Sequence, residues 1–253
     1  MIECSALCVS YGKKAVLENV SLRIEKGELV AVVGRNAAGK TTLLRALLNT
    51  VPQAKGDIAV DGTPLRELSR AAIARKISYL PQMLSDTPLS VNDAVLMGRL
   101  PHLTYPRIFR ECDREAARDA MEKMGILQYK DTPVSQLSGG YRRRCALACA
   151  LATGSDYLLL DEPTSFLDAE GAYSLLRTLR TIADSGNGVL AVLHDLPLAL
   201  RFADRLLVLD AGRIVASDTP EALFESGILD RVFGVRVCRT ELSEGYAYFT
   251  VEN

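Results

Sequence analysis

The sequence predicts an α/β fold whose core is interrupted by an inserted helical lobe. Three observations support this prediction. A glycine-rich loop stands between an apolar, strand-like run and a helix-like stretch near the N-terminus. Two further continuous apolar runs, Tyr157 to Leu160 and Val189 to Leu193, are typical of parallel strands covered on both faces. Between residues 90 and 152 the apolar residues instead recur with a helical period, and prolines mark the breaks.

The elements follow from these patterns in chain order. We expect strands at 16–24 and 29–33, a helix from about 42, a strand pair around the Asp61-Gly62 turn, a strand at 77–80, a helix at 169–183 and a terminal hairpin at 206–215. The simplest organisation is a core made of residues 1–88 and 155–253, with the helical lobe at 89–154 inserted into it. No internal repeat or low-complexity linker interrupts this single 1–253 domain.

Composition excludes several classes of protein. The 253 residues are 48% hydrophobic and 24% charged, which is ordinary for a soluble globular chain. A net charge of -1 gives no electrostatic reason to bind nucleic acid, so we expect no such partner. The longest apolar run, Cys145 to Ala152, is too short to cross a bilayer, and the N-terminus lacks the pattern of a signal peptide, so the cytoplasm is expected. Six cysteines without a C-x-x-C pair predict neither a disulfide framework nor a metal site.

The glycine-rich loop matches the P-loop pattern G-x-x-x-x-G-K-[ST] at every fixed position. Backbone N–H groups and the helix N-terminus can bind phosphate oxygens, while Lys40 adds a full positive charge and the Thr41 hydroxyl can ligate Mg²⁺. A glycine-rich turn that binds nothing is the alternative, and the Lys-Thr pair at the helix start argues against it. The candidate nucleotide-binding residues are Gly34, Arg35, Asn36, Ala37, Ala38, Gly39, Lys40, Thr41 and Thr42.

Two carboxylates, Asp161 and Glu162, follow the apolar run at Tyr157 to Leu160. In a P-loop fold this strand lies beside the P-loop strand, which would place Asp161 near the Mg²⁺ ion, directly or through water. Glu162 could then orient or deprotonate the attacking water. The alternative is an acidic cap for the next element, but two carboxylates exceed what a cap needs.

A second phosphate-binding helix start is predicted at Ser138-Gly139-Gly140. Ser138 is a favourable N-cap, and the two glycines let a ligand approach the backbone N–H groups. Taken alone, this tripeptide is a weak signal that usually marks only a cap. Its position between the P-loop and the acidic strand makes the signal specific.

With these motifs in order, the sequence resembles the ATP-binding cassette (ABC) ATPases over nearly its whole length. The resemblance rests on the Walker A loop at 34–42, the Q-loop at Gln82, the signature at 137–140, the Walker B strand at 158–162, the D-loop at 165–168, the switch histidine His194 and an adenine-stacking aromatic at Tyr11. It implies a RecA-like P-loop NTPase core, an antiparallel β subdomain and an inserted α-helical lobe.

The resemblance also implies roles for residues that are ambiguous by themselves. Gln82 would offer an amide oxygen to Mg²⁺ or water, and His194 would donate to the γ-phosphate; otherwise both are polar residues at strand ends. Asp168 would belong to the nucleotide site, and Tyr11 would stack on adenine rather than pack on a strand. Glu162, His194 and Gln82 would be catalytic, and Thr41, Gln82 and Asp161 would hold the metal.

The implied assembly is a head-to-tail homodimer with each ATP between one P-loop and the partner's Ser138-Gly139-Gly140. Integral-membrane permease subunits would hold it on the cytoplasmic face of the membrane, with a substrate-binding protein as an indirect partner. Three residues depart from the family pattern: Ala37 for Gly, Tyr141 for Gln and Phe166 for a smaller residue. If position 37 needs a positive φ, Ala costs about 1–2 kcal/mol there.

The stretch Gly98-Arg99-x-Pro101-His102 is similar to the importer branch that serves ferric siderophores, haem and cobalamin, as are residues 219–223 and 228–235. His102 lacks neighbouring ligands at metal spacing, so a turn or interface residue is favoured. The resemblance further implies that residues 82–102 form the permease-docking surface. The alternatives are a transporter ATPase for another substrate or for export, a soluble ABC protein acting on DNA or ribosomes, and a P-loop kinase. The signature motif and His194 argue against a kinase, and the single cassette argues against the soluble proteins.

Overall fold

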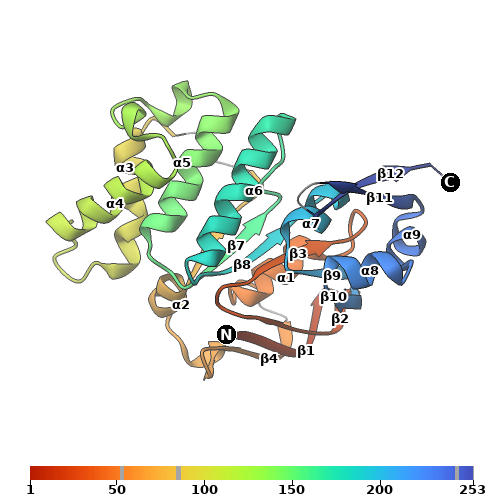
Figure 1. Ribbon diagram of the computed structural model, residues 1–253. Helices are drawn as coiled ribbons and strands as arrows, with labels where there is room; N and C mark the ends of the chain where they lie inside the picture. Colours follow the sequence, from red (N-terminus) through yellow and green to blue (C-terminus); the bar gives the residue numbers. More distant parts are fainter. Residues whose placement is uncertain (52–53, 84–86, 243–244, 253) are drawn as a thin grey trace. The chain divides into compact units, whose positions relative to one another are not determined.

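The computed structural model describes residues 1–51, 54–83, 87–242 and 245–252. Backbone contacts divide the chain into two compact units, shown in Figure 1. Unit 1 comprises Met1–Glu67 and Leu179–Asn253, and unit 2 comprises Leu68–Thr178. The helical segment predicted at 89–154 falls within unit 2; the boundaries drawn from the sequence stay a prediction.

An antiparallel sheet forms the N-terminal part of unit 1. Its strand order is β2-β1-β4-β5, with bounds β1 Ile2–Tyr11, β2 Lys14–Ile24, β4 Ala54–Val60 and β5 Thr63–Pro64. Asp61 and Gly62 connect β4 to β5 with φ angles of 50° and 77°. Both angles are positive, as a two-residue type I′ hairpin requires, so the Asp-Gly dipeptide forms the predicted turn.

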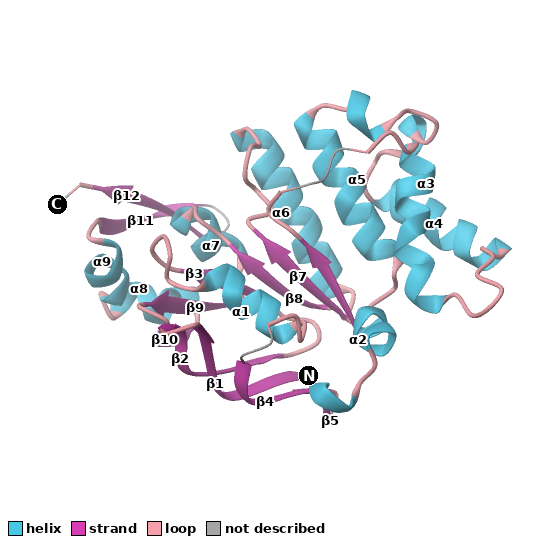
Figure 2. Cartoon of the chain, turned by 180° about the vertical axis from the view of Figure 1, so that it is seen from behind, coloured by secondary structure: helices cyan, strands magenta, loops and turns pink. Residues whose placement is uncertain are grey.

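Parallel strands form the rest of the unit 1 core, visible in magenta in Figure 2. β3 (Leu29–Val33) pairs in parallel with β8 (Gly188–Val192) and β9 (Arg205–Asp210), and β10 (Arg213–Asp218) adds antiparallel to β9. Every residue of β8 is buried, which confirms the prediction of a strand covered on both faces at Val189 to Leu193, and β3 is likewise buried throughout. Helix α1 (Lys40–Leu47) follows β3 through the P-loop.

The β9–β10 hairpin confirms the hairpin predicted at 206–215, but its predicted terminal position is wrong, because further helices and strands follow it. Helix α7 (Leu196–Phe202) precedes the hairpin, and α8 (Pro220–Glu225), α9 (Ile228–Phe233), β11 (Arg236–Leu242) and β12 (Gly245–Val251) follow it. In β11, Val237 is the buried residue, and most of the others are polar. A strand with so little buried apolar surface gives a weak alternation in the sequence.

Unit 2 combines two parallel strands with most of the helices. β6 (Ile77–Leu80) pairs in parallel with β7 (Tyr157–Asp161), and α2 (Arg70–Lys76) precedes β6. The expectation that the acidic strand lies directly beside the P-loop strand is wrong, because β3 pairs with β8 and β9 instead. The helices α3 (Val91–Leu96), α4 (Glu111–Lys123) and α5 (Gly139–Ala152) contact one another, and the 3₁₀ turn η2 (Met97–His102) follows α3. Helix α6 (Ala169–Asp184) follows β7; its residues up to Thr178 belong to unit 2 and the rest to unit 1. None of the helices in these described ranges combines the length and apolar character needed to cross a lipid bilayer.

The Gly98-Arg99-x-Pro101-His102 stretch forms a packing junction inside unit 2. A Cβ at Gly98 would lie 2.2 Å from the carbonyl oxygen of Cys149, so only glycine allows η2 to approach α5 this closely. Arg99 Nη1 donates to the carbonyl of Ala152 at 2.9 Å, at the C-terminal end of α5. His102 Nε2 lies 2.7 Å from the carbonyl oxygen of Thr153, just beyond the helix. This stretch therefore holds the end of α5 in place.

Candidate active site

The P-loop joins β3 to α1 and lies entirely in unit 1. Gly39 occupies the N-cap position of α1 with a φ of 105° and no side-chain cap, which leaves the helix start open to a ligand. Lys40 is buried, and its Nζ donates to the carbonyl oxygens of Gly34 and Arg35 at 2.7 and 3.0 Å. The loop thus places an ammonium group beside a helix N-terminus, and both positive charges favour the binding of a phosphate group.

Close packing explains the glycines of this loop. A Cβ at Gly34 would lie 2.1 Å from the carbonyl oxygen of Leu209, and one at Gly39 would lie 2.8 Å from Leu17 Cδ2. Ala37 has a φ of 62°. Position 37 therefore has the positive φ at which alanine was expected to cost stability, because an L residue is strained in the left-handed region.

His194 lies at the P-loop edge of the unit 1 sheet. β8 runs parallel to β3 with Val192 opposite Val32, and the backbone N–H of Leu193 donates to the carbonyl of Val32 at 3.0 Å. The next residue, His194, therefore leaves the sheet where Gly34 begins the loop. Its side chain is exposed.

Tyr11 ends β1, in the hairpin that also approaches the P-loop. Val16 and Leu17 of the same hairpin supply the atoms nearest to Gly39. The Tyr11 side chain is 48% exposed, which leaves its ring available for stacking. The fold of unit 1 thus gathers three predicted groups: Tyr11, the P-loop and His194.

Unit 2 gathers the predicted carboxylates with Gln82. Leu80 of β6 pairs with Leu160 of β7, so Gln82 and Glu162 follow their strands at matching positions. Gln82 Nε2 donates to Glu162 Oε2 at 2.5 Å, and the Ser165 hydroxyl donates to the same oxygen at 3.1 Å. Two donors therefore orient the Glu162 carboxylate, and Ser165 was missed as one of them by sequence reasoning.

Asp161 is only 1% exposed, at the end of β7. The Tyr79 hydroxyl donates to its Oδ2 at 3.3 Å. A buried carboxylate needs a compensating charge, and the Arg143 guanidinium interacts electrostatically with both Asp161 and Glu162. Burial lowers the pKa of Arg143, and these two carboxylates oppose that effect. The predicted acidic pair is thus accompanied by a cation.

Sequence reasoning missed Arg143. Its side chain is 3% exposed and donates to backbone carbonyls that follow β6 and β7. A signal was available, because Arg143 shares a helical stripe with Leu147 and Ala150, four and seven residues later, and both are buried. An arginine on the apolar face of a helix needs buried acceptors.

Ser138 occupies the N-cap position of α5, but its side chain makes no capping hydrogen bond. The expected capping role of the hydroxyl is therefore not realised. A Cβ at Gly139 would meet nothing within 4 Å, so the helix start is open. Tyr141 packs within unit 2, with its ring centroid 4.7 Å from that of Tyr129. Its departure from the family pattern thus has a packing partner.

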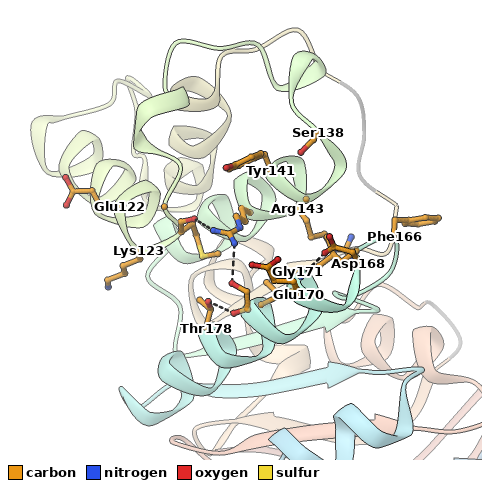
Figure 3. Close-up of a pocket in the computed structure, with 17 residues that line it drawn as sticks. Glu122, Lys123, Ser138, Tyr141, Arg143, Phe166, Asp168, Glu170, Gly171 and Thr178 are labelled. Carbon is orange, nitrogen blue, oxygen red and sulfur yellow. Dashed lines mark hydrogen bonds between the residues drawn. The ribbon is translucent and has the colours of Figure 1, made fainter.

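A cavity of about 680 Å³ lies between the start of α5 and the D-loop, within unit 2 (Figure 3). Ser138, Tyr141 and Arg143 line it from α5, and Asp168 and Phe166 line it from the D-loop. Asp168 Oδ1 accepts a hydrogen bond from the backbone N–H of Gly171 at 2.8 Å. Phe166 is 83% exposed. A nucleotide-contacting role for Asp168 stays a prediction.

Comparison with known proteins agrees with this geometry. The sequence model of the family described as ABC transporter matches residues 17–165. The chain is 41% identical over 228 residues to the hemin import ATP-binding protein HmuV of Streptomyces coelicolor, covering 90% of this chain and 81% of that protein. It is 37% identical over 233 residues to the ferric enterobactin transport ATP-binding protein FepC of Escherichia coli K12, covering 91% and 86%.

Solved structures share the fold. One of them is described as an inward-facing conformation of an ABC transporter of the metal-chelate type. It superposes with a TM-score of 0.85 at 25% identity, covering 99% of this chain and 97% of that one. A dimeric bacterial ABC transporter cassette superposes with a TM-score of 0.76 at 26% identity, covering 87% and 99%. The predicted P-loop NTPase fold is confirmed by these neighbours.

Proposed function

This chain belongs to the ABC transporter family, whose ATP-binding subunits hydrolyse ATP, and from that premise we propose that it drives a bacterial importer of iron–siderophore, haem or cobalamin-type chelates. The observation that carries the cargo class is the identity of 37–41% over nine-tenths of the chain to hemin and ferric enterobactin transport subunits. The subunit would sit on the cytoplasmic face of the membrane, bound to permease subunits and indirectly served by a substrate-binding protein, with no role for nucleic acid.

In unit 1, residues Gly34–Thr42 would bind the phosphates of ATP, with Lys40 supplying the charge and Tyr11 stacking on adenine. His194 would donate to the γ-phosphate. In unit 2, Glu162 would act on the attacking water, and its contacts with Gln82 and Ser165 support that role because they fix the carboxylate at one position.

The oxygen donors of Thr41, Asp161 and Gln82 fit Mg²⁺, which prefers oxygen ligands and takes one or two carboxylates together with substrate phosphates. The described residues contain no cluster of three or more acidic, histidine or cysteine side chains that could hold a metal alone. This donor set therefore suits an ion that arrives with ATP. When bound, the ion would supply positive charge to the phosphates.

We further propose that two copies associate head to tail, each ATP lying between one P-loop and the partner's Ser138, Gly139 and Gly140. The open start of α5 supports this arrangement, since its N–H groups lack a side-chain cap from Ser138. Asp168, which lines the cavity beside that helix, would lie at the same shared site.

Substitution of Glu162 by Gln tests the proposal. The amide keeps the shape of the side chain but cannot act as a base, so we expect ATP binding to persist while hydrolysis falls by about 10²-fold or more. Lys40→Ala should instead weaken ATP binding, because it removes the phosphate charge. Uptake of hemin, of a ferric siderophore and of cobalamin into vesicles holding the transporter would be measured beside ATP hydrolysis.

The same Glu162→Gln variant reports on the dimer. Trapped ATP should shift it from monomer to dimer in sedimentation with Mg-ATP, and Ser138→Arg should abolish that shift. Hydrolysis at the parental rate by Glu162→Gln would refute the assigned base. Uptake of none of hemin, the ferric siderophore and cobalamin by an ATP-hydrolysing transporter would refute the cargo class while leaving the ATPase intact.

A further inference from the structure

The buried side chain of Arg143 connects α5 to two other segments of the candidate active site, residues 81–82 and residues 161–163. Arg143 Nε donates to the carbonyl oxygen of Pro163 at 2.9 Å. Its Nη1 donates to the carbonyls of Pro81 and Gln82 at 3.0 and 2.8 Å. Its Nη2 donates to the carbonyls of Asp161, at 3.1 Å, and Glu162. All five acceptors are backbone oxygens.

This set of contacts uses the whole hydrogen-bonding capacity of the side chain. A guanidinium group carries five N–H donors in a rigid plane, and here five carbonyls receive them. The group is almost fully buried, so a lost bond would leave a carbonyl oxygen without water to replace the donor. The geometry of the two acceptor segments is therefore set by one residue.

The backbone that Arg143 holds has an unusual conformation. Glu162 has a φ of 49°, in the left-handed region, which is unfavourable for an L residue. Such a conformation persists when its surroundings fix it. The carbonyls of residues 161, 162 and 163 all accept from Arg143, so the guanidinium group holds the backbone on both sides of the Glu162 Cα.

We propose that Arg143 is a positioning residue for ATP hydrolysis, which fixes Glu162 and Gln82 relative to each other and to the start of α5. The proposal rests on the catalytic role proposed above for Glu162. Arg143 lies four residues after Gly139, the first residue of α5. A movement of this helix start is thus transmitted to both side chains through five hydrogen bonds.

Steady-state ATP hydrolysis by the purified 253-residue chain tests this role in two variants. Arg143→Met removes all five donors, and Arg143→Lys keeps the charge but can serve at most three of the five carbonyls. We expect kcat to fall about ten- to a hundredfold in the methionine variant, since misplacing a reacting group by about 1 Å can cost roughly 10²-fold. The lysine variant should retain an intermediate kcat. The Kd of a fluorescent ATP analogue should stay within about twofold of the parent, because the P-loop lies in the other unit.

Arg205→Lys is the matched control, because Arg205, at the start of β9, is another little-exposed arginine that donates to a backbone carbonyl, that of Arg23, and to the Glu28 carboxylate, and it belongs to no predicted site. It should lower the midpoint of thermal unfolding and leave kcat nearly unchanged. In the Glu162→Gln background, Arg143→Lys should cause no further loss of hydrolysis, since two residues acting on one step are not additive.

Several results would overturn the inference. They are a parental kcat in both Arg143 variants, an equal fall of kcat in Arg205→Lys, full additivity with Glu162→Gln, and failure of both Arg143 variants to fold, which would mark a purely structural residue. A parental rate in Glu162→Gln alone would instead refute the proposed function, so the two failures are distinguishable.

Discussion

The backbone conformation of the P-loop determines which of its residues are strained. Ala37 and Gly39 both have positive φ angles, 62° and 105°, yet only Gly39 lacks a Cβ. Close packing also requires glycine at position 39. Ala37 has the same left-handed conformation as Gly39, but it carries a Cβ where the family pattern has glycine. The chain therefore carries a small, identifiable strain in its phosphate-binding loop.

Ala37→Gly should stabilise the protein. Relief of the left-handed strain favours glycine by about 1–2 kcal/mol, and the extra freedom of the unfolded glycine offsets about half of this. We expect a net gain of about 0.5–1 kcal/mol in the free energy of unfolding, which corresponds to about 1–4 °C in Tm for a chain of this size. Ala38→Gly is the control, because Ala38 is buried and is not among the residues with positive φ. It should destabilise the chain; an equal gain in both variants would contradict the strain argument.

Residue identity predicted the chemistry of the site better than its contacts. The P-loop, Gln82, Glu162 and His194 could all be found in the sequence, because their motifs have fixed spacings. Arg143 and Ser165 could not be placed as partners of the acidic segment, since both contacts depend on how α5 and the D-loop fold back on β7. Ser138 shows the converse: a residue favourable as an N-cap stands at the right position without making the capping bond.

At the scale of the element, an ion pair connects η2 to the start of α4. Arg99 Nε donates to Asp113 Oδ1 at 3.0 Å, and Asp113 Oδ2 accepts from the backbone N–H of Arg110 at 3.0 Å. The Arg110 N–H and, after it, the Arg99 guanidinium hold the pKa of Asp113 below its ordinary range, against the opposing effect of burial. The Gly98-Arg99-x-Pro101-His102 stretch thus has a role in folding that its sequence did not reveal.

Asp113→Asn should destabilise the chain in a pH-dependent way. At pH 7 the loss of two bonds to a charged acceptor should lower the free energy of unfolding by about 2 kcal/mol. A carboxylate whose folded pKa is lowered stabilises fully above its unfolded pKa of about 4 and loses that effect as the pH falls through the folded value. The deficit of the variant relative to the parent should therefore shrink below about pH 4. Urea titrations across this range measure it.

The exposed Asp119→Asn on the same helix α4 controls for general loss of charge and should change stability by less than about 0.5 kcal/mol. A deficit in Asp113→Asn that is constant down to about pH 3 would contradict the assigned ionic contribution. A deficit that grows as the pH falls would reverse its sign.

At the scale of the whole molecule, the order of strands and helices could largely be predicted, and the C-terminal hairpin could not. Fully buried strands such as Leu29–Val33 and Tyr157–Asp161 can be predicted from their apolar composition alone. The β11–β12 hairpin depends on contacts made elsewhere: Arg239 stacks over the rings of Phe224 and Tyr246 and pairs with Glu221. Such contacts between α8 and a marginal hairpin leave no periodic pattern in the sequence.

Exposed apolar side chains concentrated in one stretch of the sequence are consistent with the predicted permease-docking surface. Six large exposed side chains of the described chain fall between residues 83 and 108: Met83, Leu89, Met97, Leu100, Tyr105 and Ile108. Exposed apolar residues concentrated in one segment indicate a contact surface. The prediction from sequence covers residues 82–102 and includes Leu84, which lies outside the described residues.

Changing Leu84 and Leu89 together to Asp should separate the subunit from its membrane partner. Placing two carboxylates in an apolar interface should weaken association by roughly 10²-fold or more, since about 1.4 kcal/mol corresponds to a factor of ten. ATP affinity should stay within about twofold, because the P-loop residues belong to unit 1 and the changed residues to unit 2.

Co-purification with the tagged permease would be measured beside nucleotide affinity. Leu242→Asp in β11 is the matched control, with an exposed fraction of 42% against 40% for Leu89, and it should co-purify normally. Normal co-purification of the double variant, or a loss of ATP binding in step with it, would place the docking surface elsewhere.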